Sequence, residues 1–425
     1  MAARKSFMQS DAGNAVLLAL AVLLSLLVVE LVGRLLAEPC ESCWGQVLGM
    51  ELPPFDVIPD TDTSAVDRGA PFGGLIVDGD TVTIDDLWGI NREDSLLGYA
   101  PLESSRSANG WWQTNSVGAR AGTETDSLPP ANTSRVLAFG DSFAIGSRVR
   151  QEETWSYQAD LLQDDFEVVN FGVDGYSLAQ AYLRYQDVSN RIAYDWIIVL
   201  FPPSTTLARD VNVSRSLFGW GRALPGPRFV VEDDGLRLIR GPYSSMRDML
   251  ADNADGVNPE FVNYLRRYDA FYLRTKYERP PIVGDLFVYK LIARFVFRLQ
   301  ERRLLGRLLR ETSEAMTVSR AILSAWSRTV NEKGGRMLIA YLPARADVTE
   351  YGEKDRFRKG WDRIVSGPCP ERASCLDLMG ALRRAPREQV DAGYDGTHYG
   401  PRGNGILARA IVEEMSRERT SERNP

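Results

Sequence analysis

The chain contains 425 residues, of which 44% are hydrophobic, 25% charged and 10% aromatic. This balance is typical of a globular protein with a sizeable core, and it excludes a disordered, collagen-like or disulfide-scaffold chain. The formal net charge is -7, from 50 Lys and Arg against 57 Asp and Glu, which is the wrong sign for binding nucleic acid through its phosphates. His398 is the only histidine, so a zinc site built on several imidazoles is excluded. We expect neither a metal nor another cofactor.

An apolar segment near the N-terminus predicts one transmembrane helix at about residues 13–36. Residues 12–29 carry no charge, and the apolar pattern continues beyond Glu30 to Leu36. At 1.5 Å of rise per residue, this length crosses a bilayer core of roughly 30 Å. The membrane is therefore an expected partner of the chain through this helix.

The charges before this segment predict its orientation. Arg4 and Lys5 precede it, so the positive-inside rule places residues 1–12 in the cytoplasm and the body in the periplasm or another extracytoplasmic space. A cleaved signal peptide is the alternative, but its apolar region is usually only about 7–15 residues long. A clear small-x-small cleavage site is also missing around Ala37, and Pro39 fits a lipobox before Cys40 poorly.

The four cysteines form two close pairs, Cys40/Cys43 and Cys369/Cys375. In an oxidising compartment each pair could close a small local loop, and two structural disulfides are the simplest interpretation. A redox motif at Cys40 and Cys43 is the alternative. A thioredoxin-like site, however, needs a strand before it and a helix after it, whereas here a membrane span precedes and Pro53-Pro54 follows.

The body divides into a lead-in and a larger domain. Residues 37–130 read as a linker and a small β-rich lead-in, with short alternating stretches. Residues 131–415 alternate strands, turns and helices, which predicts a parallel α/β sheet buried on both faces by helices, in three layers. The strands are expected at 135–139, 167–170, 196–201 and 336–342, and helices at 154–162 and after Asn404. Residues 416–425 are expected to be a disordered tail.

Residues 213–330 interrupt this pattern and are interpreted as a helical insertion or cap. Its stretch 286–310 has apolar residues at helical spacing, broken by basic side chains at Lys290, Arg294, Arg298, Arg302 and Arg303. A basic amphipathic helix can lie on an anionic membrane surface. The commoner arrangement is a cap helix that buries its apolar face on the domain and leaves its charges in water.

Candidate chemistry begins at Gly140-Asp141-Ser142-Phe143, directly after a predicted buried strand. The carboxyl ends of strands are the usual location of a site in an open α/β sheet. Alone, the triplet is also consistent with an ordinary turn. The segment 169–177 likewise follows a strand, and its glycines would let a backbone N–H approach developing negative charge, although a tight turn needs the same glycines.

Far downstream, Asp395 stands three residues before His398. A serine hydroxyl becomes a good nucleophile only when a base takes its proton, and that base needs a carboxylate to fix its tautomer. The three separated motifs therefore contain the residue types of a Ser-His-Asp triad.

In this order, the motifs resemble those of the SGNH/GDSL hydrolase family. The resemblance covers residues 135–212 and 336–412, and the stretch 115–120, Asn-Ser-Val-Gly-Ala-Arg, resembles the lead-in of membrane-anchored members. It implies a flavodoxin-like, three-layer α/β fold. It also implies that Ser142 is the nucleophile and one oxyanion donor through its own N–H, that Gly175 is a second donor, and that Asp395 and His398 complete the triad.

One departure concerns the third motif of the family, which normally reads Gly-x-Asn or Gly-Asn-Asp after the third strand. This chain has Pro202-Pro203-Ser204-Thr205-Thr206 instead, and Thr205 stands where the asparagine is expected. Its hydroxyl is a candidate replacement donor, and Asn212 folding back is another. Losing one oxyanion donor typically costs about 10²–10³ in turnover.

The resemblance implies an esterase that acts on ester bonds and removes acyl groups. Its substrate would be an acylated carbohydrate, such as O-acetylated envelope or extracellular polysaccharide, or a lipid ester. An O-acyltransferase that uses the same acyl-enzyme is an alternative. A catalytically weak glycan-binding or assembly protein is another, because of the altered third motif. The substrate, the oligomeric state and any protein partners cannot be derived from the sequence.

Overall fold

The structure is a computed structural model. It describes residues 11–40, 42–58, 75–77, 80–82, 90–107, 110–218, 224–233, 235–344, 347–348, 361–365, 367, 369–385, 394–395 and 398–423. The chain forms two compact units: unit 1 contains residues 1–60 and 270–304, and unit 2 contains residues 61–269 and 305–425. The predicted insertion is therefore shared between the two units.

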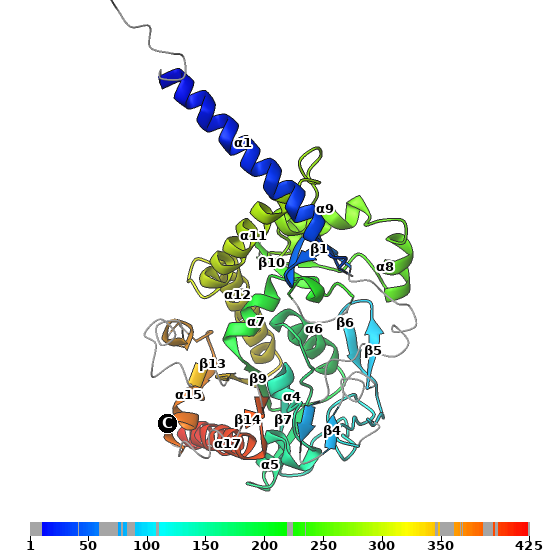
Figure 1. Cartoon of the computed structure of the whole chain (residues 1–425). Coiled ribbons are helices and arrows are strands. Elements are labelled where there is room, and N and C mark those ends of the chain that lie inside the picture. The colour runs from blue at the N-terminus through cyan, green and yellow to red at the C-terminus, as the bar shows by residue number, and fades with distance from the viewer. Residues whose placement is uncertain are drawn as a thin grey trace, which may run out of the picture. The chain divides into compact units, whose positions relative to one another are not determined.

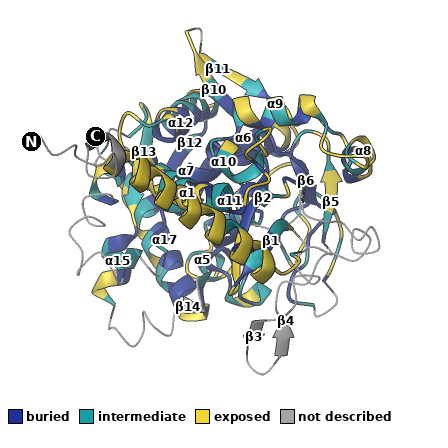
Figure 2. Cartoon of the chain, turned by 45° about the horizontal axis from the view of Figure 1, so that its top comes forward, coloured by how far each residue is buried: buried dark blue, intermediate teal, exposed yellow. Residues whose placement is uncertain are grey.

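Unit 1 is built around a long apolar helix. Its elements are α1 (Asp11–Leu36), β1 (Cys43–Val47), β2 (Met50–Phe55), α10 (Arg274–Tyr277) and α11 (Phe287–Leu308), the last of which ends beyond the unit. Helix α1 is long and apolar enough to cross a membrane, and its residues from Asn14 to Leu36 are exposed except Glu30 and Gly33 (Figure 2). By these properties alone it is either a membrane anchor or a signal sequence.

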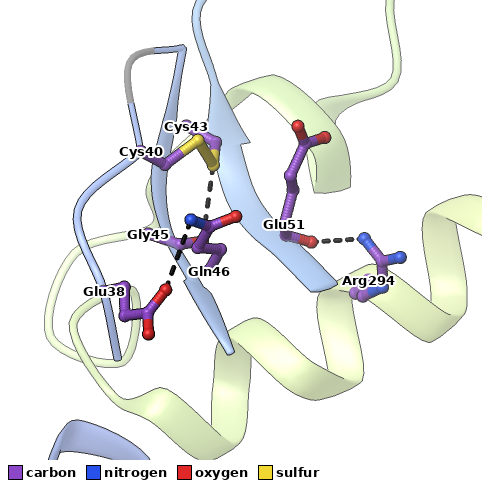
Figure 3. Close-up of a disulfide and its surroundings, with 7 residues drawn as sticks. All are labelled: Glu38, Cys40, Cys43, Gly45, Gln46, Glu51 and Arg294. Atoms are coloured by element: carbon purple, nitrogen blue, oxygen red, sulfur yellow. Dashed lines mark hydrogen bonds between the residues drawn. A yellow bond between two sulfur atoms is a disulfide. The ribbon is translucent and has the colours of Figure 1, made fainter. Parts of the chain in front are cut away.

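The antiparallel hairpin β1–β2 packs against α11 in unit 1. Val47 and Leu52 form a small buried cluster with Phe287, and the rings of Phe55 and Phe297 meet edge to face at 5.6 Å. The hairpin follows the Cys40–Cys43 disulfide (Figure 3). The helix expected at 286–310 is confirmed, and part of its apolar face is buried on this hairpin.

Unit 2 contains a five-stranded parallel sheet (Figure 1). Its strands are β7 (Ser134–Gly140), β8 (Phe166–Asn170), β9 (Trp196–Phe201), β12 (Arg336–Tyr341) and β13 (Ala373–Asp377), and their spatial order is β8-β7-β9-β12-β13. Numbered along the chain, this order is 2-1-3-4-5, the flavodoxin-like arrangement with its switch point beside β7. The predicted parallel α/β fold is confirmed.

Helices cover both faces of the sheet. They are α4 (Ser142–Ile145), α5 (Trp155–Asp160), α6 (Leu178–Val188), α7 (Pro203–Asp210), α12 (Glu314–Glu332), α15 (Met379–Arg384) and α17 (Pro401–Arg423). On one face, alternate strand residues such as Ala138 pack with Trp155 and with Ile411 of α17. On the other face, the ring of Phe139 meets that of Trp326 in α12 at 5.7 Å. Strand residues alternate between the two faces, so both layers of helices are needed to bury the sheet.

The remaining elements of unit 2 are short. They are the hairpins β3–β4 (Leu75–Val77, Asp80–Val82), β5–β6 (Asn91–Asp94, Gly98–Pro101), β10–β11 (Arg228–Glu232, Gly235–Ile239) and β14–β15 (Tyr394–Asp395, His398–Tyr399), the helices α8 (Met246–Asp252) and α9 (Pro259–Tyr268), and the 3₁₀ turns η2 (Gln151–Glu153) and η3 (Arg215–Phe218). Two of these hairpins, β3–β4 and β5–β6, lie within residues 37–130. The second predicted disulfide, Cys369–Cys375, is also formed.

Three expectations need correction. The last part of the predicted insertion, α12, belongs to a helical layer of the sheet, because Trp326 packs on Phe139. The last helix begins at Pro401, before Asn404. The expected disordered tail is helical as far as Arg423, because Ser416 donates to the Gln163 side chain at 3.1 Å and Arg419 pairs with Asp165 at 2.6 Å.

Candidate active site

Ser142 lies at the carboxyl end of β7, as the first residue of α4. The Asp141 side chain accepts a hydrogen bond from the Phe143 N–H at 3.0 Å and thereby caps this short helix. Gly140 is required because a Cβ there would lie 1.9 Å from the carbonyl oxygen of Leu200 in the neighbouring strand. The serine is only 2% exposed. The chain thus turns sharply at the sheet's edge and leaves Ser142 in an enclosed position.

A buried ion pair lies directly beneath this turn. The Oδ2 atom of Asp141 is 2.6 Å from Nη1 of Arg209 in α7, and both side chains are almost completely buried. Arg209 also donates to the carbonyl oxygen of Tyr176 at 3.2 Å. Burial raises the pKa of Asp141, and the Arg209 charge opposes this shift. The pair connects the turn at Ser142 to α7, the helix that follows β9.

Arg120 holds the loop that follows α4. Its guanidinium donates to the carbonyl oxygens of Ile145, Gly146 and Val149 at 2.9, 2.5 and 2.6 Å, and to that of Trp111 at 3.1 Å. Arg120 is only 3% exposed. Burial lowers the pKa of Arg120 to about 9, so the side chain keeps its charge at neutral pH. This clamp gives a structural role to the last residue of the 115–120 motif.

Asn115 at the start of that motif shapes the turn leading to Arg120. Its Oδ1 accepts the N–H groups of Val117 and Ala119 at 3.2 and 3.0 Å, and its Nδ2 donates to Thr125 at 2.9 Å. These bonds fix the chain just before the clamp. The 115–120 motif therefore supports the loop that follows α4.

The glycine-rich segment after β8 packs against α4. A Cβ at Gly172 would lie 2.5 Å from the Ile145 nitrogen, which explains the glycine. Ser147 donates to Asp174 at 2.7 Å, and this contact joins the two loops. Gly175 has a φ of +71°, and a Cβ there would lie 2.8 Å from the Tyr99 hydroxyl. The two predicted oxyanion segments, the nucleophile turn and the glycine loop, are therefore side by side.

His398 meets Ser142 across the end of the sheet. Its Nε2 atom is 2.8 Å from the serine Oγ, and its ring lies 4.6 Å from that of Phe143, centre to centre. The Tyr399 hydroxyl donates to the carbonyl oxygen of Pro343, beyond β12, at 2.6 Å. Asn404 donates to the Tyr399 carbonyl oxygen at 3.2 Å. Residues 256 positions apart in sequence are brought together by these bonds.

The electrostatic setting of His398 favours its neutral form. Burial, and then the positive charges of Arg148 and Arg209, lower the pKa of His398 to about 3. A neutral imidazole can accept a proton, so it is in the form that a general base requires. The same cations also favour negative charge that develops beside Ser142.

The structure places the other predicted site residues as follows. The backbone of Asp395 pairs with that of His398 in the hairpin β14–β15, and its side chain lies outside the described atoms. Thr205 is half-buried in the first turn of α7, and its hydroxyl donates to the Pro202 carbonyl oxygen at 3.4 Å. Asn212 does not fold back, because its Nδ2 donates to the Ser214 carbonyl oxygen and to Asp269, both at 2.8 Å.

Sequence reasoning did not identify the roles of Arg120 and Arg209. The first belonged to a recognised motif without an assigned role, whereas nothing in the sequence around Arg209 points to a partner 68 residues away. Among the described residues, no group of three or more His, Cys, Asp or Glu side chains is placed to hold a metal ion.

Comparison with known proteins gives weak but consistent likenesses. No family model and no curated protein matches the chain. Among solved structures, a lipolytic protein of the G-D-S-L family from Veillonella parvula is 13% identical, with 67% of this chain and 98% of that one covered and a TM-score of 0.31. An esterase from a Pseudoalteromonas species is 9% identical, with coverages of 68% and 99% and a TM-score of 0.31.

A catalytic mutant of an acetylxylan esterase from Geobacillus stearothermophilus is 13% identical, with coverages of 66% and 93% and a TM-score of 0.29. At these values the fold assignment rests on the strand order of unit 2, and the site on its own contacts. The chain has the sheet order and the motif placement that its resemblance to the SGNH/GDSL hydrolases implies.

Proposed function

We propose that the chain is a membrane-anchored, extracytoplasmic serine esterase of the SGNH/GDSL type. The observation that carries the proposal is the 2.8 Å contact between Ser142 Oγ and His398 Nε2 at the carboxyl end of the parallel sheet. A histidine ring nitrogen within hydrogen-bond distance of a serine hydroxyl is the arrangement that serine activation requires. Burial keeps the His398 ring in the neutral form that can accept a proton.

In the proposed reaction, the Ser142 oxygen attacks the ester carbonyl while His398 Nε2 takes the hydroxyl proton. The carbonyl oxygen becomes an oxyanion, stabilised by the N–H groups of Ser142 and Gly175 and by the Thr205 hydroxyl, which turns from the Pro202 carbonyl oxygen to donate to it. The protonated imidazole then gives its proton to the departing alcohol, and an acyl-enzyme remains. Water, deprotonated by the same nitrogen, releases the acid and restores the serine. Asp395 would orient the ring and stabilise the imidazolium.

The proposed substrate is a carbohydrate that carries small O-acyl groups. Ser142 is only 2% exposed, and this enclosure favours an acetyl group over a long acyl chain. The charges of half-buried Arg148 and buried Arg209 lie close to the base, and a charged surrounding suits a polar carbohydrate better than a lipid tail.

For the membrane topology, we propose that α1 anchors the chain with the N-terminus in the cytoplasm and the body outside. Arg4 and Lys5 before the span support this orientation. The Cys369–Cys375 disulfide in unit 2 also supports an oxidising compartment for the body.

The test is acetate release from acetylated xylan by the full-length chain in detergent. We expect release by the wild type, loss of release in Ser142→Ala, and unchanged release in Ser127→Ala, an exposed serine in the same unit. Adding an unacetylated oligosaccharide distinguishes the acyltransferase alternative, since acetyl groups would then appear on it at the expense of free acetate. A folded wild type that binds the polysaccharide and releases nothing would favour the binding alternative.

A further inference from the structure

Unit 1 exposes large apolar side chains close to the end of α1. Three of them are almost fully or largely exposed: Ile282 at 94%, Leu48 at 91% and Phe295 at 66%. We define the apolar collar as Leu48, Ile282, Val283, Leu286, Ile292 and Phe295, all of which are exposed. They come from the tip of the hairpin β1–β2, the segment before α11, and α11 itself.

The contacts within unit 1 place the segment before α11 beside the last turns of α1. The Phe287 ring packs so closely on Gly33 that a Cβ there would lie 2.1 Å from it. The Arg34 guanidinium donates to the carbonyl oxygen of Asp285 at 2.8 Å. Leu286 therefore stands between two residues that touch the end of the proposed membrane span, and Ile282 precedes the first of them, Asp285, by three residues.

The first turn of helix α11 also contacts the last turns of α1. The Val288 N–H donates to the Glu30 carboxylate, one turn before Arg34 in α1, at 3.0 Å. Ile292 and Phe295 follow one and two turns later along α11, and both are exposed. The exposed apolar part of α11 thus begins where α1 ends.

The hairpin β1–β2 is also tied to the chain just after α1. Glu38 and Gln46 form an antiparallel bridge, with N–H to oxygen distances of 2.8 and 2.9 Å. This bridge joins the hairpin to the chain two residues after Leu36, the last residue of α1, and Leu48 follows Gln46 by two residues, in the turn between β1 and β2. The disulfide in Figure 3 closes the reversal between the two segments.

The other face of α11 is already occupied. Ala293 and Phe297 are buried, and Arg294 donates to the carbonyl oxygen of Glu51 in the hairpin (Figure 3). The helix therefore has one face fixed on the hairpin and another that carries Ile292 and Phe295 without protein cover.

We propose that the apolar collar lies in the interfacial layer of the membrane that α1 spans, on the side of the body. The proposal rests on the anchor proposed above and is independent of the esterase reaction. Amphipathic helices bind interfaces by burying their apolar face about 5–10 Å into the boundary between headgroups and acyl chains. Arg302 and Arg303, exposed further along α11, then face the headgroup phosphates.

The test uses the full-length chain in phosphatidylcholine nanodiscs with single cysteines labelled by a fluorophore. The two collar positions are Ile282→Cys and Phe295→Cys. Leu23→Cys in α1 is the membrane control, and Leu161→Cys, 71% exposed in unit 2, is the aqueous control. Quenching is measured with lipids that carry a doxyl group near the headgroup, with lipids that carry it near the end of the acyl chain, which is the depth expected for position 23, and, separately, with iodide in the water.

We expect doxyl lipid to quench positions 282 and 295 about threefold more than position 161, and iodide to quench them less, as interfacial burial requires. Quenching at 23 but not at 282 and 295 would overturn the collar and leave the anchor intact. Protection from iodide without lipid quenching would overturn it in favour of a second copy of the chain covering these residues. No lipid quenching at 23 would overturn the anchor and the collar together, while acetate release would still report on the esterase proposal.

Discussion

Replacing Arg120 by alanine is expected to destabilise unit 2 strongly. The side chain is buried and donates to four backbone carbonyl oxygens. Each buried acceptor left without a partner costs about 1–3 kcal/mol. Water entering the vacated space would satisfy some of them, so we expect a loss of about 4 kcal/mol, towards the low end of the sum.

The measurement is thermal unfolding of the full-length chain in detergent, followed by circular dichroism. For a unit of this size, about 4 kcal/mol corresponds to a fall in Tm of about 10 °C. Arg120→Lys should recover only part of this loss, because an ammonium cannot reproduce the guanidinium fork. Arg92→Ala is the matched control, since the Arg92 side chain is 51% exposed and its ion pair with Asp94, in the same hairpin, is 3.3 Å long. We expect a change within about 0.5 kcal/mol. A loss below about 1 kcal/mol in Arg120→Ala would refute the clamp.

Three further predictions concern the site. Arg209→Met should destabilise the chain by about 3–5 kcal/mol because it leaves Asp141 buried without its cation, and adding Asp141→Asn should recover part of the loss. Equal melting temperatures for the single and double variants would contradict the pairing. Because the pKa of His398 lies below its usual 6.5, kcat/KM should stay level as the pH falls from 7 to about 5. Arg148→Gln should move the fall in kcat/KM at acid pH to a higher pH, and a wild type whose kcat/KM already falls at or above pH 6.5 would contradict the lowered pKa. Thr205→Val should lower kcat by about 10²-fold with an unchanged Tm, and an unchanged kcat would remove Thr205 from the oxyanion site.

The sheet could be predicted because its strands are short, continuous apolar runs. β9 lies at the predicted residues 196–201, and β7, β8 and β12 differ only at their ends. The edge strand β13 was missed, since Ala373–Asp377 is half-buried and mixes polar with apolar residues. The same reasoning explains the helical continuation of α17 to Arg423, which depends on contacts with Gln163 and Asp165 that no local pattern reveals.

The site could be predicted in part for the same physical reason. Ser142 is a candidate from sequence because functional residues often stand at strand ends, and His398 because it is the only imidazole; the structure brings these two side chains into contact. The support around them is formed by pairs distant in sequence, such as Asp141 with Arg209 and Ser147 with Asp174. Pairing of this kind depends on which loops the topology brings to one sheet edge, so a single sequence does not reveal it.

Labelling of the full-length chain with a fluorophosphonate probe tests the central claim most directly, because the probe reports an activated serine whatever the substrate. Ser142→Ala and His398→Ala are compared with the wild type and with Ser127→Ala. The account predicts labelling of the wild type and Ser127→Ala, and loss of labelling in both site variants. A folded wild type that is not labelled, or labelling that persists in Ser142→Ala, would contradict it.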